Sequence, residues 1–113
     1  MKTSASKNEI LKRELEQLFC DQDANIETAA QCLKVMSHPA RLRILCALRK
    51  GEQTVQNLEY YTGIKQSTLS QHLALLKSRG VLVSRRETTY SFYGFSNDRI
   101  IQLFDLIKEV FCT

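Results

Sequence analysis

The stretch that decides the fold is "TVQNLEYYTGIKQSTLSQHLALLKSRG", residues 54–80. Its pattern predicts a short helix over 55–62, a tight turn at Gly63 and a longer helix over about 66–79 that Gly80 ends. Two helices joined by a short turn containing glycine are typical of a helix-turn-helix. The stretch therefore predicts a DNA-binding motif around which the rest of the chain can be interpreted.

The second helix of this motif has one apolar and one polar face. Leu69, Leu73 and Leu76 recur at helical spacing and predict the buried side. In a helix-turn-helix the second helix enters the major groove, led by its N-terminal residues. Short or amide side chains there can reach base edges or phosphates, although capping and surface polarity would also explain the serines and the threonine. The predicted DNA contacts on this helix are Gln66, Ser67, Thr68, Ser70, Gln71, His72 and Lys77.

The hydrophobic period changes after Gly80. "VLVSRRETTYSFYGF", residues 81–95, alternates as strands do and can turn at "ETT", which predicts a β-hairpin. Arg85 and Arg86 lead into its tip. Such a hairpin could act as a wing that contacts the DNA backbone or the minor groove.

A final helix is predicted over "DRIIQLFDLIKEVFC", with Ser96 or Asn97 as its cap. Its apolar stripe is broader than a small domain can easily bury, which predicts a dimer interface. The stripe comprises Ile100, Leu103, Phe104, Ile107, Val110 and Phe111.

The upstream sequence predicts helices over residues 8–19, about 26–36 and about 40–50. "DQDAN" interrupts the first two, and "SHPAR" separates the last two, with Ser37 or His38 as a cap and Pro39 at the first helical position. The predicted fold is mainly α with a β-hairpin wing, a homodimeric winged helix-turn-helix. Residues 1–24 would form a helical extension, and residues 25–113 the DNA-binding and dimerisation domain.

The charge distribution favours a polyanionic partner. The net charge is +4, and no acidic residue falls between Glu27 and Glu52 or between Glu59 and Glu87. A solvated basic face would give the same pattern. No apolar run approaches the ~20 residues that cross a bilayer, and the start lacks the apolar block of a signal peptide. We therefore expect a cytoplasmic protein without a membrane partner.

The cysteines should be reduced in that compartment. Their spacing is too irregular for a disulfide scaffold, and no CxxC pair is present for zinc or thioredoxin-type chemistry. They are Cys20, Cys32, Cys46 and Cys112.

Three blocks carry a family resemblance: "LKVMSHPARLRILCAL" (33–48), "QSTLSQHLALLKSRGVLVSRR" (66–86) and "YSFYGFS" (90–96). They resemble the ArsR/SmtB family of bacterial winged-helix repressors over about residues 26–113. The resemblance implies a homodimer, paired largely through its first core helix and its last helix. It also implies binding to an inverted repeat in operator DNA, which an inducer releases.

Metal sensing, common in that family, does not fit this chain. One family site uses a CxC-type pair on the helix before the recognition helix, where this chain has "TVQNLEYYTG". Another uses Asp and His ligands on the last helix, which here has Asp98, Asp105 and Glu109 but no histidine. The two histidines, His38 and His72, sit in no ligand cluster. The sequence therefore predicts no metal ligand and no other cofactor.

The cysteines resemble the dithiol branch of the family, the persulfide- and redox-sensing repressors of the SqrR, BigR and HlyU kind. In that branch a cysteine after the "HPxR" stretch faces one at the end of the last helix, which implies Cys46 and Cys112 here. On a helix, Arg43, Arg49 and Lys50 would neighbour Cys46, and nearby cations stabilise a thiolate. Cys112 would lie at a helix C-terminus, where a thiolate is disfavoured. We therefore expect Cys46 to react first and Cys112 to resolve the product.

The predicted function is a repressor that senses sulfide-derived persulfides through a Cys46–Cys112 bridge that weakens operator binding. A general redox or peroxide sensor needs the same two thiols and stays open. A thiol enzyme would want a base or a substrate cradle that is not evident, so no enzymatic activity is expected. A winged-helix module that binds no DNA is a further alternative. Cys32 is expected in the core, and Cys20 has no assigned role.

Overall fold

The structure is a computed structural model that describes residues 7–13 and 23–112. The chain divides into two compact units, Met1–Gln31 and Cys32–Thr113. In the first unit, residues 7–13 are helical and overlap the helix predicted over 8–19. The rest of that predicted helix and Cys20 lie outside the described residues.

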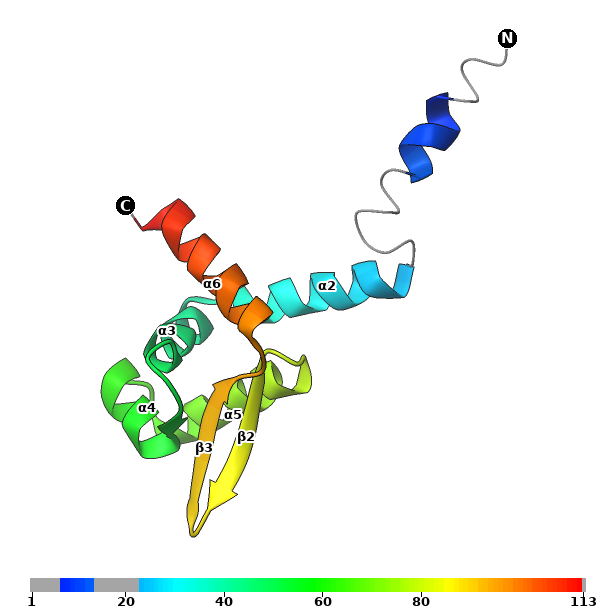
Figure 1. Cartoon of the computed structure of the whole chain (residues 1–113). Helices are drawn as coiled ribbons and strands as arrows, with labels where there is room; N and C mark the ends of the chain where they lie inside the picture. Colours follow the sequence, from blue (N-terminus) through cyan, green and yellow to red (C-terminus); the bar gives the residue numbers. More distant parts are fainter. Residues whose placement is uncertain (1–6, 14–22, 113) are drawn as a thin grey trace. The chain divides into compact units, whose positions relative to one another are not determined.

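The element order is that of a winged helix-turn-helix and confirms the predicted fold class (Figure 1). The elements are α2 (Asp23–Met36), α3 (Pro39–Leu48), β1 (Gln53–Thr54), α4 (Val55–Thr62), α5 (Gln66–Ser78), β2 (Leu82–Glu87), β3 (Tyr90–Phe95) and α6 (Asp98–Phe111).

Predicted start signals are confirmed at three helices. The side chains of His38, Thr54 and Asn97 each accept a hydrogen bond from a backbone N–H of the helix that follows, at 3.1, 3.2 and 3.0 Å. Pro39 occupies the first position of α3, where its missing N–H has no cost. Gly63 ends α4 with a φ of 72°, a left-handed conformation that suits glycine.

Two helix boundaries differ from the prediction. The interruption predicted at "DQDAN" is too long, because α2 already begins at Asp23. An acidic residue is favourable at a helix N-terminus, so this segment can start a helix as well as break one. The helix predicted to reach Lys50 ends at Leu48, where the Arg49 N–H bonds the Cys46 carbonyl at 3.2 Å and tightens the last turn.

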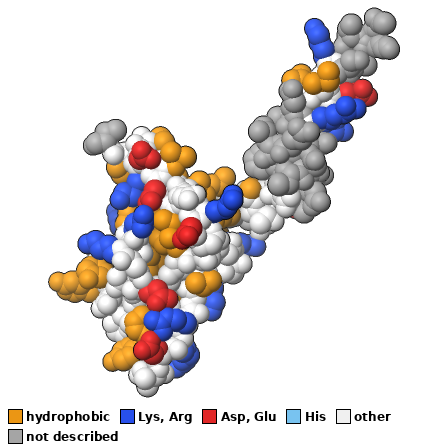
Figure 2. Space-filling model, viewed as in Figure 1, with side chains coloured by type: hydrophobic (Ala, Val, Ile, Leu, Met, Phe, Trp, Pro, Cys, Tyr) orange, Lys and Arg blue, Asp and Glu red, His pale blue; other side chains and the backbone are white. Residues whose placement is uncertain are grey.

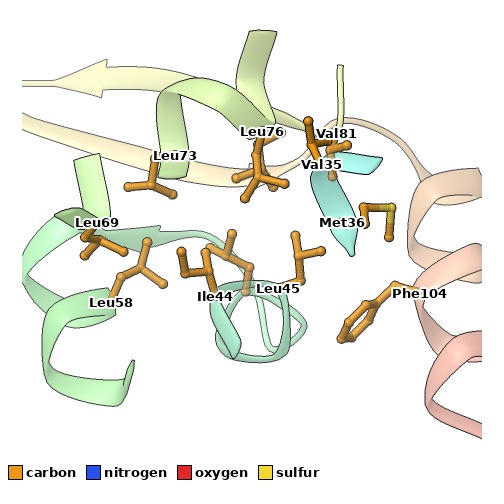
Figure 3. Close-up of a cluster of buried hydrophobic side chains, with 12 residues drawn as sticks. Val35, Met36, Ile44, Leu45, Leu58, Leu69, Leu73, Leu76, Val81 and Phe104 are labelled. Atoms are coloured by element: carbon orange, nitrogen blue, oxygen red, sulfur yellow. The ribbon is translucent and has the colours of Figure 1, made fainter. Parts of the chain in front are cut away.

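The core lies where α3, α4, α5 and α6 meet (Figure 3). Leu69, Leu73 and Leu76 of α5 are fully buried, as predicted, and face side chains of α3 and α4. Phe104 closes the core from α6. The apolar side of α5 is thus held inward, which leaves its polar side outside.

A three-stranded antiparallel sheet in the order β1–β3–β2 forms the wing. The predicted hairpin is confirmed, with Thr88 in its turn at a φ of 56°. β1 was not predicted, because a strand of two residues is too short to show alternation. By pairing with β3, it joins the wing to the start of α4.

Candidate nucleic-acid interface and thiol site

The predicted DNA-reading face of α5 is open to solvent. By helical geometry Ser67 and Gln71 lie opposite the three buried leucines, and the other exposed side chains flank them. The exposed residues among those predicted are Gln66, Ser67, Thr68, Ser70, Gln71 and Lys77. These amides, hydroxyls and one ammonium can hydrogen-bond base edges and phosphates.

Lys77 links this helix to the wing. Its Nζ donates a hydrogen bond of 2.7 Å to the Ser84 Oγ of β2. The link fixes the position of the wing relative to α5.

The two wing arginines have different surroundings. Arg85 donates from Nε to Glu52 at 3.0 Å and from Nη1 to Glu87 at 2.6 Å, and its guanidinium lies 4.7 Å from the centre of the Phe92 ring. The Glu52 carboxylate first, then that of Glu87, raises the pKa of Arg85. Arg86 is exposed and forms no ion pair within the part of the chain that the structure describes. Figure 2 shows acidic and basic side chains lying close together over the wing.

Gly94 of β3 allows the contact between Glu52 and Arg85. A Cβ at this position would lie 3.1 Å from the Glu52 Cγ, which is tighter than ordinary packing. The close approach of that side chain to β3 therefore depends on glycine.

His72 is half-buried at the edge of α5, and its ring centre lies 5.0 Å from that of His38. Burial first, then the positive charges of Arg41 and His38, lowers the pKa of His72. The Nε of Arg41 is buried without a hydrogen-bond partner among the described residues. His72 thus contacts the N-cap of α3, whereas the other predicted α5 residues are exposed.

Cys46 is exposed on α3, in a hollow of about 330 Å³ between α3 and α4. The side chains that line this Cys46 hollow are Arg43, Cys46, Ala47, Lys50, Tyr61 and Thr62. Two of the three cations predicted near Cys46 therefore share its hollow. Tyr61 was not predicted, because it lies on another helix and carries no pattern of its own.

Cys112 follows α6 as its C-cap, and its N–H bonds the Lys108 carbonyl at 2.7 Å. The thiol is exposed and lines a second hollow, of about 310 Å³, with Asp105, Lys108 and Glu109. Asp105 and Glu109 place negative charge in this hollow, and Lys108 places positive charge there.

The third predicted cation, Arg49, joins the two cysteine-bearing helices. Its Nε and Nη2 donate to the two carboxylate oxygens of Asp105 at 2.7 and 2.9 Å. This bidentate salt bridge connects the C-terminal end of α3 to α6. The hydrogen bond from Arg49 holds the pKa of Asp105 below its usual range. Cys46 lies one turn before Arg49 on the same side of α3, and Cys112 shares the second hollow with Asp105.

The third described cysteine, Cys32, packs against the core as expected, and burial raises the pKa of its thiol. It is therefore a poor nucleophile compared with the exposed thiols. Within residues 7–13 and 23–112, no group of three or more His, Cys, Asp or Glu side chains could hold a metal ion. No helix of the same residues is long and apolar enough to span a membrane.

The C-terminal half of α6 exposes apolar side chains to solvent (Figure 2). Phe104 is buried, but Leu106, Val110 and Phe111 are 57%, 61% and 79% exposed. Ile100, Leu103, Phe104 and Ile107 of the predicted stripe thus belong to the core or pack against it. Val110 and Phe111 have no cover within the described residues, nor does Leu106, which was not part of the predicted stripe.

A comparison with family models matches residues 38–84 to the one described as "Bacterial regulatory protein, arsR family". Over 93 residues the chain is 38% identical to the biofilm growth-associated repressor of Xylella fastidiosa strain Temecula1, a match that covers 82% of each protein.

Two solved structures are similar in both sequence and fold. One is the homodimeric winged helix-turn-helix DNA-binding domain of Mb0332 from Mycobacterium bovis, which is 33% identical with a TM-score of 0.74 and covers 77% of this chain and 81% of its own. The other is HlyU from Vibrio cholerae, 34% identical with a TM-score of 0.75, covering 81% and 100%. HlyU from the same organism has also been solved in a form described as reduced.

Proposed function

We propose that this chain, which belongs to the bacterial ArsR family of regulatory proteins, is an operator-binding repressor whose affinity for DNA falls when Cys46 and Cys112 are bridged. Its family and its winged helix-turn-helix fold make it a DNA-binding transcriptional repressor that works as a homodimer, not an enzyme. Since bacterial operator DNA lies in the cytoplasm, the repressor acts there. The proposal concerns the residues that contact DNA and the signal that releases it.

The exposed face of α5 supplies the base-reading contacts. Gln66, Ser67, Ser70 and Gln71 have amide or hydroxyl side chains that can hydrogen-bond base edges when the helix lies in the groove, and no charge to bury unpaired. Thr68 sits at one edge of this face, and Lys77 and the wing arginines add positive charge beside it. His72 contributes through its contact with His38, which steadies α5 against α3.

The dimer forms through the exposed part of α6. Leu106, Val110 and Phe111 leave an apolar surface that a second copy would cover, and the similar domain of Mb0332 is described as homodimeric. Two recognition helices then meet half-sites about 34 Å apart on an inverted repeat. A small change at α6 therefore alters the spacing of both DNA-reading faces.

The observation that carries the proposed switch is the contact between α3 and α6 through Arg49 and Asp105. Each of these helices has a free, exposed cysteine beside that contact. A covalent bridge between Cys46 and Cys112 would restrain α3, which packs against the recognition helix, to the dimerising helix. By chain-entropy arguments such a bridge could stabilise the bridged state by about 4 kcal/mol, and a difference of about 1.4 kcal/mol between states changes DNA affinity tenfold.

The chemistry balances with a low-molecular-weight persulfide, R–S–SH. The Cys46 thiolate attacks the outer sulfur, the S–S bond breaks, and R–S⁻ leaves and takes up the proton that Cys46 released. Cys112 then attacks the Cys46 Sγ, which forms the disulfide and releases hydrogen sulfide. The two protein thiols are oxidised and the transferred sulfur is reduced, so no further oxidant is needed.

Operator binding before and after persulfide treatment tests this function. Treatment of the wild type should weaken binding at least about tenfold, and Cys46→Ser and Cys112→Ser should each abolish the response. Unchanged affinity after complete bridging would refute the switch. Mass spectrometry after persulfide or peroxide treatment separates the alternatives. A bridge that forms with persulfide but not with peroxide, or one that retains extra sulfur, indicates persulfide sensing, while the same plain disulfide from both reagents indicates a general redox sensor.

The order of reaction is tested with a limiting neutral alkylating reagent on the reduced protein. Cys46 should be modified faster than Cys112, because the charged side chains of its hollow are two cations, whereas two carboxylates and one lysine line the other. Faster modification of Cys112 would reverse the assigned roles.

A further inference from the structure

The Cys46 hollow has the features of a binding site as well as a reactive thiol. Arg43, Cys46 and Ala47 of α3 form one wall together with Lys50 in the turn that follows, and Tyr61 and Thr62 at the end of α4 form the other. Its volume, about 330 Å³, lies at the lower end of the range of small-molecule pockets. The space is large enough for more than the sulfur atoms of an inducer.

The polar groups of the hollow differ in whether they already have hydrogen-bond or ion-pair partners within the chain. The Thr62 hydroxyl donates to the Leu58 carbonyl at 2.6 Å and accepts from the Ile64 N–H at 3.2 Å, so it has little capacity left for a ligand. Arg43 and Lys50 form no ion pair with any residue that the structure describes. Among the described residues no carboxylate lines the hollow.

The two cations lie on either side of the thiol along the chain. Arg43 lies about one turn before Cys46 on α3, and Lys50 lies in the turn that follows the end of α3. Tyr61, 59% exposed, offers an aromatic and hydroxyl surface opposite them. A small molecule whose carboxylate pairs with either cation would therefore hold its sulfur near the Cys46 Sγ.

We propose that the Cys46 hollow binds the inducer before it reacts and selects persulfides of thiols that carry a carboxylate. This inference rests on the proposed function, since it concerns the first attack by Cys46. The Cys112 hollow has mixed charge, because Lys108 lines it together with Asp105 and Glu109, so it attracts an anion less than the two cations of the Cys46 hollow do. The charge of the two hollows thus directs an anionic inducer to Cys46.

Paired substrates give the test, because a loss of charge near Cys46 also changes the thiolate itself. The rate constant for persulfide transfer to Cys46 is measured in the Cys112→Ser protein with two probes. One is glutathione persulfide, and the other is the persulfide of glutathione diester, in which both carboxylates are esterified and uncharged. Any change in the thiolate alters both rates equally. A loss of recognition of the probe's carboxylates alters the ratio of the two rate constants, glutathione persulfide over diester persulfide. This ratio is compared between variants.

Arg43→Gln and Lys50→Gln should each lower the ratio about threefold to fivefold, and added salt should lower it in the parent protein. Lys108→Gln, which removes an exposed lysine from the other hollow, should leave it unchanged. Circular dichroism of each variant checks that the fold is retained. An equal effect of Arg43→Gln and Lys50→Gln on both probes, or none on either, would overturn the inference.

The outcomes separate this inference from the function on which it rests. If both probes modify Cys46 at similar rates and operator binding still falls after bridging in the parent protein, the switch holds and charge selection is wrong. If neither probe modifies Cys46, or bridging leaves operator binding unchanged, the proposed function fails.

Discussion

The wing resembles, in one respect, the surface around Cys46, Arg49 and Lys50, here called the thiol face of α3. In each, two adjacent basic residues that the sequence marked for function have different surroundings. Arg85 is held by carboxylates while Arg86 is free of ion pairs with described residues, and Arg49 is held by a carboxylate while Lys50 is likewise free. The comparison indicates that a cation paired within the chain positions structure, and its free neighbour is available to an external anion.

The largest effect should come from separating the two wing arginines. Arg86→Ala should lower operator affinity about fivefold to tenfold and reduce the slope of log affinity against log salt by about 1, because a phosphate contact is lost. Arg85→Ala removes the same charge but should leave the slope nearly unchanged, since its carboxylate partners already neutralise it. Filter binding or fluorescence anisotropy over a salt series measures both.

These two variants control for each other because both remove one positive charge from adjacent positions. Equal changes in slope would mean that Arg85 leaves its carboxylates when DNA binds. That result would refute the distinction between paired and free cations in the wing.

A smaller effect should follow from breaking the pair on the thiol face. Asp105→Asn should shift the bridging equilibrium between Cys46 and Cys112 towards the reduced form by about twofold to fivefold, because α3 and α6 lose a fixed contact. Equilibration in glutathione redox buffers followed by thiol trapping measures it. The double exchange Arg49→Asp with Asp105→Arg restores the pair and should recover most of the loss.

The pair on the thiol face also predicts a pH dependence. Because Arg49 lowers the pKa of Asp105, the contribution of the pair to stability is present above the ordinary aspartate range and is lost as pH falls through the lowered pKa.

If Asp105→Asn leaves the bridging equilibrium as it is in wild type, the contact does not position the thiols.

Local signals in the sequence predicted the fold well, but they could not separate these cations. Caps, glycine turns and the leucine stripe of α5 act within a few residues, so a single sequence shows them directly. Arg49 and Asp105 are 56 positions apart, and Arg85 and Glu52 are 33 apart. No periodicity links such residues, and only the packing of α6 on α3, and of the wing beside the loop after α3, makes them partners.

The candidate site was predictable to the same extent. The exposed face of α5 follows from helical spacing, and the two exposed cysteines follow from the family resemblance. The half-burial of His72 does not, because it arises from the N-cap of α3 and not from α5. Tyr61 likewise reaches the Cys46 hollow from a different helix.

The smallest effect is expected at His72. The sequence predicted that its imidazole contacts DNA, but the ring packs beside His38 at the start of α3. Because burial, Arg41 and His38 lower its pKa, the folded state favours neutral His72. Its contribution to stability is therefore complete above about pH 6.5 and is lost as pH falls through the lowered pKa. Thermal unfolding from pH 8 to 5 should show a smaller acid-dependent loss of Tm in His72→Gln than in wild type.

The comparison at pH 8 is the internal control, because His72 is neutral there and any difference in Tm reflects packing alone. The acid-dependent part then reports the charge that His72 would bring beside Arg41 and His38. A Tm difference that stays constant from pH 8 to 5 would show that protonated His72 turns away into solvent. His72 would then be available to the phosphate backbone, and in mildly acidic solution operator affinity should rise in wild type but not in His72→Gln.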